Sequence, residues 1–436
     1  MADFVNQFQQ RIRKKNIKIA VVGLGYVGLP LALEFSRRGI KVLGVEVDGD
    51  RLKQLMSRKS YISDTCDKEI REAFASGRFA ATGDFSAVKQ ADVIIICVPT
   101  PLKRKYHPDI SYIKKAVKSI SKSLKHGVLI ILESTTYPGT TEEVIVPLLE
   151  KNNFKHNKDF YLSFSPERID PGNKKYPVNK IPKVVGGVSP QATVLAASVY
   201  ENIIDKVVPV SSSRTAEAVK LLENTFRLIN IALIDELAMM AHKMNIDIWE
   251  VIEAAKTKPF GFMPFYPGPG VGGHCIPKDP LYLYWKAKHF GFRSRFIKLA
   301  SDIINYMPAY VVSRTEDILL QQNISLKGAK ILVMGVTYKK DILDLRKSPS
   351  IDIIEILQAK EARVSYFDPI IPYLKFHRID LRSIRLSKEA LKKFHCVIIA
   401  TDHSGVDYGF VLKHAHLIFD ARRVYGHTKD KKVVML

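Results

Sequence analysis

The chain has 436 residues, 46% of them hydrophobic and 25% charged, and a formal net charge of +23. This balance is typical of a globular protein with room for two or three domains. The cysteines, Cys66, Cys97, Cys275 and Cys396, are too few and too scattered for a disulfide framework or a metal cluster, so we expect no metal and a reducing cytoplasm. The apolar runs are too short to span a membrane, and the N-terminus shows no apolar signal-peptide core.

The positive charge is compatible with nucleic acid, a membrane surface or anionic small molecules as partners. The lysines and arginines are spread along the whole chain, without a long basic run or a nucleic-acid motif. We therefore expect a solvated basic surface that attracts an anionic nucleotide, and no nucleic-acid partner.

Alternating strand and helix patterns begin near the N-terminus. Residues 16–22 predict a buried parallel strand, residues 29–38 a helix that ends at Gly39, and residues 41–47 the next strand. Together they form a βαβ unit of the usual length. Because further strands are expected at 93–98, 128–133 and 160–164 with helical patterns between them, the sequence predicts an α/β fold with a doubly wound parallel sheet.

The pattern changes in the middle of the chain. From residue 215 to residue 245 apolar residues recur at helical spacing with no proline or glycine, which predicts a helix of about 30 residues. We interpret it as a connecting spine and as a surface for dimerisation. The Pro/Gly-rich residues 258–279 predict an irregular loop, the kind of segment where functional sites tend to lie.

A second α/β unit follows, with strands at 330–335, 362–367 and 396–401 and a helix at 350–358. The turn after its first strand reads Gly-Val-Thr-Tyr-Lys-Lys instead of G-x-G-x-x-G. We therefore expect this unit to bind a different nucleotide or none. The sequence therefore predicts two Rossmann-like doubly wound parallel-sheet domains joined by a long central helix. The expected boundaries are 1–212, 213–318 and 319–436.

The first strand is followed by Gly23-Leu24-Gly25-Tyr26-Val27-Gly28, a G-x-G-x-x-G turn that opens a helix. In this context the turn predicts a dinucleotide site, with the pyrophosphate at the helix N-terminus. Glu46, at the end of the second strand, is placed to accept hydrogen bonds from a ribose and to repel a 2′-phosphate, which favours NAD over NADP. Arg51 could offset this repulsion, so the choice stays open.

Residues 272–280 read Gly-Gly-His-Cys-Ile-Pro-Lys-Asp-Pro and place Cys275 in a loop beside two glycines. The glycines would let the backbone approach a ligand closely. A cysteine alone is more often a small buried apolar residue. Beside a dinucleotide site, however, a thiol near charged groups suggests a dehydrogenase that also forms a covalent intermediate.

Four motifs together carry a family resemblance: residues 23–30, 133–140 (Glu-Ser-Thr-Thr-Tyr-Pro-Gly-Thr), 165–172 (Ser-Pro-Glu-Arg-Ile-Asp-Pro-Gly) and 272–280. Over essentially its whole length the chain resembles the UDP-glucose/GDP-mannose dehydrogenase family, and within it the UDP-N-acetylglucosamine 6-dehydrogenases of surface-polysaccharide pathways. The resemblance implies an NAD-binding domain, a dimerising central helix and a C-terminal domain for UDP. It also implies a four-electron oxidation of a sugar 6-hydroxyl to a carboxylate with two NAD.

The resemblance also implies a role for each matching residue. Cys275 is the nucleophile, which forms a thiohemiacetal and then a thioester. Lys220 and Asn224, four residues apart on the long helix, stabilise an oxyanion, although on propensity alone they would be ordinary polar residues. Asp279, with Lys220, positions or activates a water, and Glu167 is an acid/base group for the hydrolytic step. Thr135 either orients water or cofactor, or caps a strand end.

Further binding positions are implied in the same way. Arg346 reaches the cofactor, and Lys339 and one of Arg422 and Arg423 bind the substrate, since arginine pairs bidentately with phosphate. The cofactor positions around the glycine turn and nearby are Gly23, Gly25, Tyr26, Val27, Gly28, Glu46, Arg51, Thr100 and Thr135.

One departure from the family pattern bears on the sugar. Typical UDP-glucose dehydrogenases carry an arginine upstream of the cysteine that serves the neighbouring subunit's sugar site, but residues 258–267 contain none. An aromatic, proline-rich wall that includes Phe262 and Phe265 suits an acetamido methyl group better than bare hydroxyls. We therefore expect a UDP-N-acetylhexosamine substrate, with UDP-N-acetylglucosamine preferred. UDP-N-acetylmannosamine or UDP-N-acetylgalactosamine, and a catalytically silent NAD and nucleotide-sugar sensor, remain as alternatives.

Overall fold

The computed structural model describes residues 2–62, 65–103, 106–168 and 178–436. The end of the 165–172 motif, from residue 169 onward, lies outside these ranges. The chain forms two compact units, residues 1–223 with 281–292, and residues 224–280 with 293–436. The three-domain division stays a prediction.

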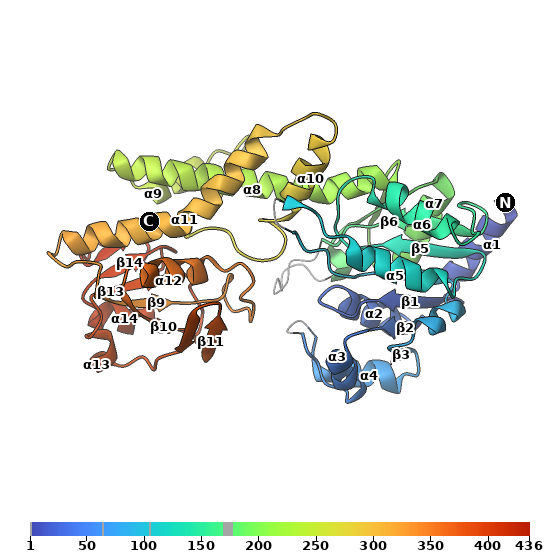
Figure 1. Cartoon of the computed structure of the whole chain (residues 1–436), viewed down its shortest axis with the longest axis horizontal. Helices are drawn as coiled ribbons and strands as arrows, with labels where there is room; N and C mark the ends of the chain where they lie inside the picture. The colour runs from blue at the N-terminus through green and yellow to red at the C-terminus, as the bar shows by residue number, and fades with distance from the viewer. Residues whose placement is uncertain (1, 63–64, 104–105, 169–177) are drawn as a thin grey trace. The chain divides into compact units, whose positions relative to one another are not determined.

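The first unit is built on a sheet of eight strands in the order β3-β2-β1-β4-β5-β6-β7-β8 (Figure 1). Adjacent strands are parallel except β6 and β7, which pair antiparallel. The strands are β1 (Lys18–Val22), β2 (Lys41–Val45), β3 (Phe79–Thr82), β4 (Val93–Ile96), β5 (Val128–Leu132), β6 (Phe160–Phe164), β7 (Lys183–Gly187) and β8 (Val207–Pro209).

Helices cover both faces of this sheet, which confirms the doubly wound fold. Successive side chains of a strand point to opposite faces: Ile19 and Val21 of β1 enter one apolar cluster, and Ala20 and Val22 enter another. The helices are α1 (Ala2–Arg13), α2 (Gly28–Arg37), α3 (Gly49–Met56), α4 (Asp67–Ala75), α5 (Ser111–Ser121), α6 (Val146–Glu150) and α7 (Pro190–Tyr200), with short turns η1 (Phe85–Gln90), η3 (Thr141–Ile145) and η4 (Val178–Lys180).

The predicted long helix is α8 (Ser213–Lys243), with 31 residues. It begins in the first unit and ends in the second. Three helices follow it, α9 (Ile248–Ala255), α10 (Asp279–Lys288) and α11 (Arg295–Leu320). The loop expected at 258–279 runs from α9 to the first turn of α10.

The second unit contains a fully parallel five-stranded sheet in the order β10-β9-β13-β14-β15. Its strands are β9 (Lys330–Met334), β10 (Arg363–Phe367), β13 (Cys396–Ile399), β14 (Ile418–Asp420) and β15 (Val433–Met435), and its helices are α12 (Pro349–Ala359), α13 (Lys388–Leu391) and α14 (Tyr408–His414). The second α/β unit is thus confirmed. A hairpin of β11 (Tyr373–Phe376) and β12 (Ile379–Arg382) was not predicted.

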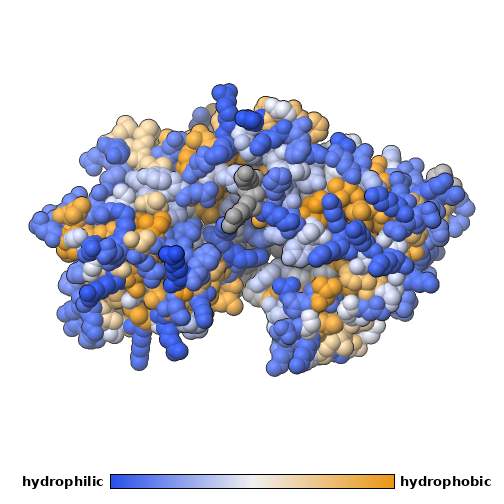
Figure 2. All heavy atoms as spheres, in the orientation of Figure 1, coloured by the Kyte–Doolittle hydropathy of each residue, from blue (hydrophilic) through white to orange (hydrophobic). Residues whose placement is uncertain are grey.

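Hydrophilic residues cover most of the face drawn in Figure 2, between smaller apolar areas. Within the described ranges no helix is long and apolar enough to cross a membrane.

Candidate active site

The glycine turn has the geometry that a dinucleotide requires. Gly23 has φ +89°, and a Cβ on Gly28 would lie 1.9 Å from the Gly23 carbonyl oxygen, so both positions exclude a side chain. A Cβ on Gly25 would meet no atom within 4 Å. The backbone at Gly25 therefore borders open space at the start of α2, which fits the pyrophosphate of NAD.

Glu46 lies directly after β2 and is buried. Its carboxylate accepts hydrogen bonds from the backbone N–H groups of Leu24 (3.0 Å) and Asp48 (3.0 Å), so it ties the glycine turn to the end of β2. Arg51 is half-buried on α3, and its Nε lies 3.8 Å from Asp48 Oδ2. Arg51 is thus engaged by Asp48, and the contact of Glu46 with a ribose stays a prediction.

Other predicted cofactor positions differ in exposure. Tyr26 is exposed, Val27 is half-buried, and Thr100 is buried, with its carbonyl accepting a hydrogen bond from the Tyr282 hydroxyl of α10. Thr135 is half-buried just after β5, and its role stays a prediction.

Glu167 follows β6 and belongs to a buried group of charges in the first unit. Its Oε2 lies 3.2 Å from the Lys183 ammonium, and its Oε1 accepts the backbone N–H of Arg168. Arg168 in turn donates to Glu223 of α8 (2.6 Å). The Ser-Pro-Glu segment is thereby attached to the helix that carries Lys220. Neither Lys183 nor Glu223 was singled out from the sequence.

Lys220 is half-buried on α8, three residues after a second buried carboxyl group, Glu217. Glu217 accepts hydrogen bonds from the backbone N–H groups of Gly139 and Thr141 and from the Thr141 hydroxyl. Burial raises the pKa of Glu217 to about 7 against these bonds. Glu217 thus fastens the 133–140 motif to α8.

In the second unit the structure brings Asn224, Asp279 and the Cys275 backbone together. The Asn224 side-chain amide donates to Asp279 Oδ2 (2.7 Å), and both residues are buried. The Cys275 carbonyl accepts the backbone N–H groups of Lys278 (3.0 Å) and Asp279 (2.8 Å). The exposed Cys275 therefore lies at the N-terminus of α10, an environment that favours a thiolate.

The glycines beside Cys275 pack closely against another segment of the chain. A Cβ on Gly272 would lie 2.5 Å from Tyr338 Cβ and 2.7 Å from the Lys347 carbonyl, and Gly273, with φ +86°, donates its N–H to the Arg346 carbonyl. They allow the loop that carries Cys275 (residues 258–279, the cysteine loop) to pack closely on residues 338–347. Their expected close approach to a ligand stays a prediction.

The sequence reasoning also missed His274 and Lys278, whose ring nitrogens and ammonium lie 3.0–3.1 Å apart. Burial and the nearby Lys278 lower the pKa of His274 to about 4, so the imidazole is neutral at physiological pH. Burial lowers the pKa of Lys278, while Asp279 and Cys275 act in the opposite direction. The Lys278 side chain thus lies within electrostatic reach of the predicted nucleophile.

The predicted substrate arginines have different surroundings. Arg422 Nε donates to the Ala400 carbonyl, and Arg422 Nη1 would lie 3.0 Å from a Cβ on Gly268, so this guanidinium faces the cysteine loop. Arg423 lies over the Trp249 ring of α9, 5.4 Å from its centroid. Which arginine binds substrate stays a prediction.

Lys339 and Arg346 lie in the loop after β9. Arg346 is exposed and makes a two-pronged contact with Asp344. The loop is held by the buried His403, whose Nδ1 accepts the Asp341 N–H (3.1 Å) and whose Nε2 lies 3.1 Å from Asp368 Oδ2. Because Nδ1 accepts, the proton of a neutral ring belongs on Nε2 and is donated to Asp368. His403 is a further organising residue that no motif indicated.

Within the described part of the chain, no group of three histidine, cysteine, aspartate or glutamate side chains could hold a metal ion.

Comparison with known proteins gives matches along most of the chain. Models of the UDP-glucose/GDP-mannose dehydrogenase family match at residues 17–204 (NAD-binding domain), 214–306 (central domain) and 332–427 (UDP-binding domain). A UDP-N-acetyl-D-glucosamine 6-dehydrogenase of Pseudomonas aeruginosa is 39% identical over 93% of this chain and 92% of its own. A UDP-N-acetyl-D-mannosamine dehydrogenase of Pyrococcus horikoshii is 36% identical over 89% and 90%.

Among solved structures, a UDP-D-ManNAc dehydrogenase from Pyrococcus horikoshii superposes with a TM-score of 0.87. It is 33% identical, and the match covers 96% of this chain and 98% of that one.

A buried aspartate beside the cysteine loop should make the stability of the fold depend on pH. Asp235 of α8 accepts the Gly268 N–H (3.0 Å), while its Oδ2 is buried without a partner in the described structure. Burial raises the pKa of Asp235 to about 8, although the Gly268 bond and Arg422 lower it. The folded state therefore binds this proton more tightly than the unfolded state. The resulting stability is complete below about pH 4 and is lost as the pH rises through 8.

Asp235→Asn keeps a side-chain oxygen that can accept the Gly268 N–H, and it removes the carboxyl group that titrates. The difference in Tm between the variant and the wild type, measured by differential scanning calorimetry, should grow in favour of the variant by at least roughly 2 °C from pH 4 to pH 8. The exposed Asp317→Asn is the control and should show a constant difference. A difference for Asp235→Asn that is also independent of pH would contradict this interpretation.

Proposed function

We propose that this chain, which belongs to the UDP-glucose/GDP-mannose dehydrogenase family, oxidises UDP-N-acetyl-D-glucosamine to the corresponding uronate. Membership of the family makes it an NAD-dependent oxidoreductase that acts on a UDP-sugar. The observation that carries the proposed chemistry is the exposed Cys275 at the start of α10, where Asn224 holds Asp279.

The proposed route needs a nucleophile because an aldehyde must be converted into a species that can lose a second hydride. NAD, when bound, supplies the hydride acceptor for both oxidations. The Cys275 thiolate adds to the aldehyde carbon at position 6, and the C–S bond forms as the carbonyl oxygen becomes an oxyanion. Lys220 and Asn224 stabilise this oxygen. Loss of hydride then leaves a thioester on Cys275.

Hydrolysis completes the proposed sequence. A water loses a proton to Glu167, its oxygen bonds to the thioester carbon, and the C–S bond breaks with the Cys275 thiolate as leaving group. Asp279 positions the water, and Lys278 offers a nearby positive charge to the returning thiolate. Lys339 and an arginine of the 422–423 pair bind the diphosphate.

The choice of sugar rests on the loop before Cys275. Relatives at similar identity include enzymes named for N-acetylglucosamine and for N-acetylmannosamine. Phe262 is 38% exposed and offers an apolar surface to an acetamido methyl group. Phe265, by contrast, packs on Phe226 and on the cluster between α8 and α9, so its ring supports the loop. UDP-N-acetylmannosamine is the alternative substrate.

We expect NADH production to be fastest with UDP-N-acetylglucosamine in a panel that includes the N-acetylmannosamine, N-acetylgalactosamine and glucose forms. Phe262→Ala should lower kcat/KM for the preferred acetamido sugar by roughly tenfold, because one lost methyl contact is worth about 1–3 kcal/mol. The same change should alter the much lower UDP-glucose activity less. Initial rates of NADH absorbance measure both effects.

Phe376→Ala is the matched control, since Phe376 is 39% exposed on the hairpin. It should leave the sugar ranking unchanged. Fastest turnover of UDP-N-acetylmannosamine would transfer the proposal to that sugar. Equal efficiency with UDP-glucose would refute an acetamido site.

We also propose that the enzyme is at least a homodimer. Exposed apolar side chains recur on α8 at spacings of four and seven residues, which places them on one stripe: Leu222, Phe226, Leu233 and Met240. Such a stripe on a long helix suits burial against a second copy of the chain.

Sedimentation velocity at assay concentration should give a dimer or a larger species. Leu233→Glu should shift it towards monomer, because a buried unpaired carboxylate opposes association. Phe376→Glu, a similar change on the hairpin, should not. A monomeric wild-type protein would contradict the proposal.

A further inference from the structure

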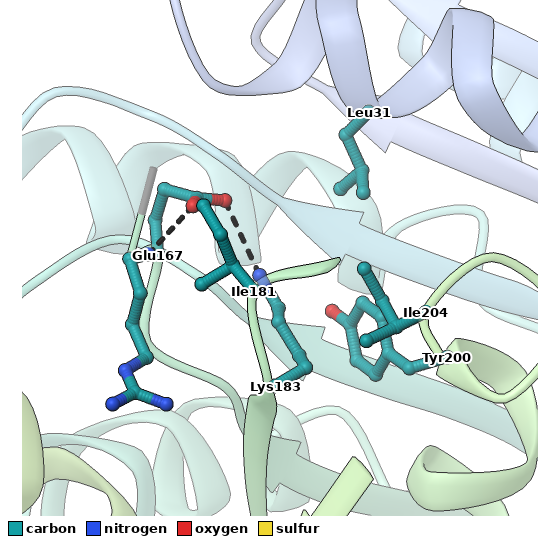
Figure 3. A pocket seen from close by; sticks show the side chains of 7 residues that line it. Leu31, Glu167, Ile181, Lys183, Tyr200 and Ile204 are labelled. Atoms are coloured by element: carbon teal, nitrogen blue, oxygen red, sulfur yellow. Dashed lines mark hydrogen bonds and ion pairs between the residues drawn. The ribbon is translucent and has the colours of Figure 1, made fainter. Parts of the chain in front are cut away.

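A buried network of charges lies at the edge of the first unit's sheet where β5 and β6 end. Strand β7 runs antiparallel to β6, with Gly187 opposite Ser163 and Gly186 opposite Phe164. Extending this register brings Lys183, the first residue of β7, opposite Glu167. The Lys183 ammonium lies 3.2 Å from Glu167 Oε2 (Figure 3) and 3.2 Å from Glu133 Oε1.

The rest of the network surrounds Glu133. The Tyr200 hydroxyl of α7 donates to Glu133 Oε1, and the Lys183 ammonium lies 5.1 Å from the Tyr200 ring. Cys97, just after β4, faces the same group, and burial, with Glu133 second, raises the pKa of its thiol. Glu133 Oε2 is buried without a hydrogen bond to any described residue. On the other side Arg168 holds the Glu167 segment to α8 and, through the Pro182 carbonyl, to the start of β7.

The network holds two carboxyl groups and one ammonium. Burial by itself would lower the pKa of Lys183, but Glu133 and Glu167 outweigh it and raise that pKa. Burial raises the pKa of Glu133 even though Lys183 opposes the shift. The lysine therefore keeps its charge, while burial disfavours the ionised form of Glu133. Glu167 is left as the natural partner of the ammonium.

Two other readings of this arrangement have less support. The space that Glu167, Lys183 and Tyr200 line has room for about one water, which is small for a ligand site. A buried ion pair is also weak evidence for stability, since apolar side chains of similar volume often serve as well. The network instead fixes one carboxylate at the end of β6.

We propose that Lys183 is a positioning residue that holds the Glu167 carboxylate in place and keeps it ionised for its work as the hydrolytic base. This inference rests on the proposed function, in which Glu167 takes a proton from water. Lys183 acts through Glu167 and does not itself touch substrate or cofactor.

The test compares the pH dependence of kcat for the full-length enzyme with saturating NAD and its preferred UDP-sugar. Lys183→Met keeps the length of the side chain and removes the charge that favours ionised Glu167. The acid limb of the profile should therefore move to higher pH by about one to three units, with a smaller effect on KM for the sugar. Lys183→Arg keeps the charge and should restore most of the wild-type profile.

Glu133→Gln is the matched control because it damages the same buried network while removing a negative charge near Glu167. It should not move the acid limb to higher pH. If Lys183→Met does not fold, Lys183→Gln is uncharged and should give the same upward shift.

An unshifted limb in the uncharged Lys183 variants, with only a lower plateau, would overturn the inference and leave Lys183 a packing residue. Equal upward shifts in Glu133→Gln would do the same. These results differ from a failure of the proposed function, in which the wild-type enzyme itself would make no uronate from any UDP-sugar.

Discussion

The hydrogen bond from Asn224 to Asp279 is the contact on which the arrangement around Cys275 depends. It joins the long helix α8 to the first residue of α10, and both partners are buried, so its loss would remove a donor from a buried carboxylate. Because the backbone N–H of Asp279 also binds the Cys275 carbonyl, the same residue fixes the turn that presents the thiol. Packing of Gly272 on Tyr338 holds the other side of the loop. The predicted nucleophile is thus on an exposed turn that is held from both sides.

Buried charge organises the first unit in a comparable way. Glu46 connects the glycine turn with the end of β2, Glu217 holds the 133–140 motif to α8, and Lys183 joins the ends of β5 and β6. Each of these groups lies at the carboxyl end of the parallel strands or beside it, where ligands of open α/β sheets bind. The apolar layers on the two faces of the sheet supply the stability. The polar contacts fix the positions of the loops at the carboxyl ends of the strands.

The fold and the motif residues could be predicted from the sequence because they depend on local patterns. Apolar runs, the glycine turn and the uninterrupted helical spacing of α8 each leave a signal within about 30 residues. No such local signal marks the contacts of Lys183, His403 and Glu217. Their partners come from distant segments, and the contacts depend on the antiparallel pairing of β7 or on the conformation of a loop. Phe265 illustrates the same limit: the sequence predicts an aromatic wall at this position, but it does not indicate that the ring packs on Phe226. The packing of Gly272 and Gly273 on residues 338–347 leaves no local signal either, because the residues that approach them are distant in the sequence.

In the proposed mechanism Cys275 holds the sugar covalently between its two oxidations. The most direct measurement is the number of NADH molecules formed for each UDP-N-acetylhexosamine consumed, with the product identified by mass spectrometry. We expect two NADH and a uronate for the wild-type enzyme, and loss of uronate production in Cys275→Ser with NAD binding retained. One NADH with free aldehyde as the final product, or normal uronate production by Cys275→Ser, would contradict it.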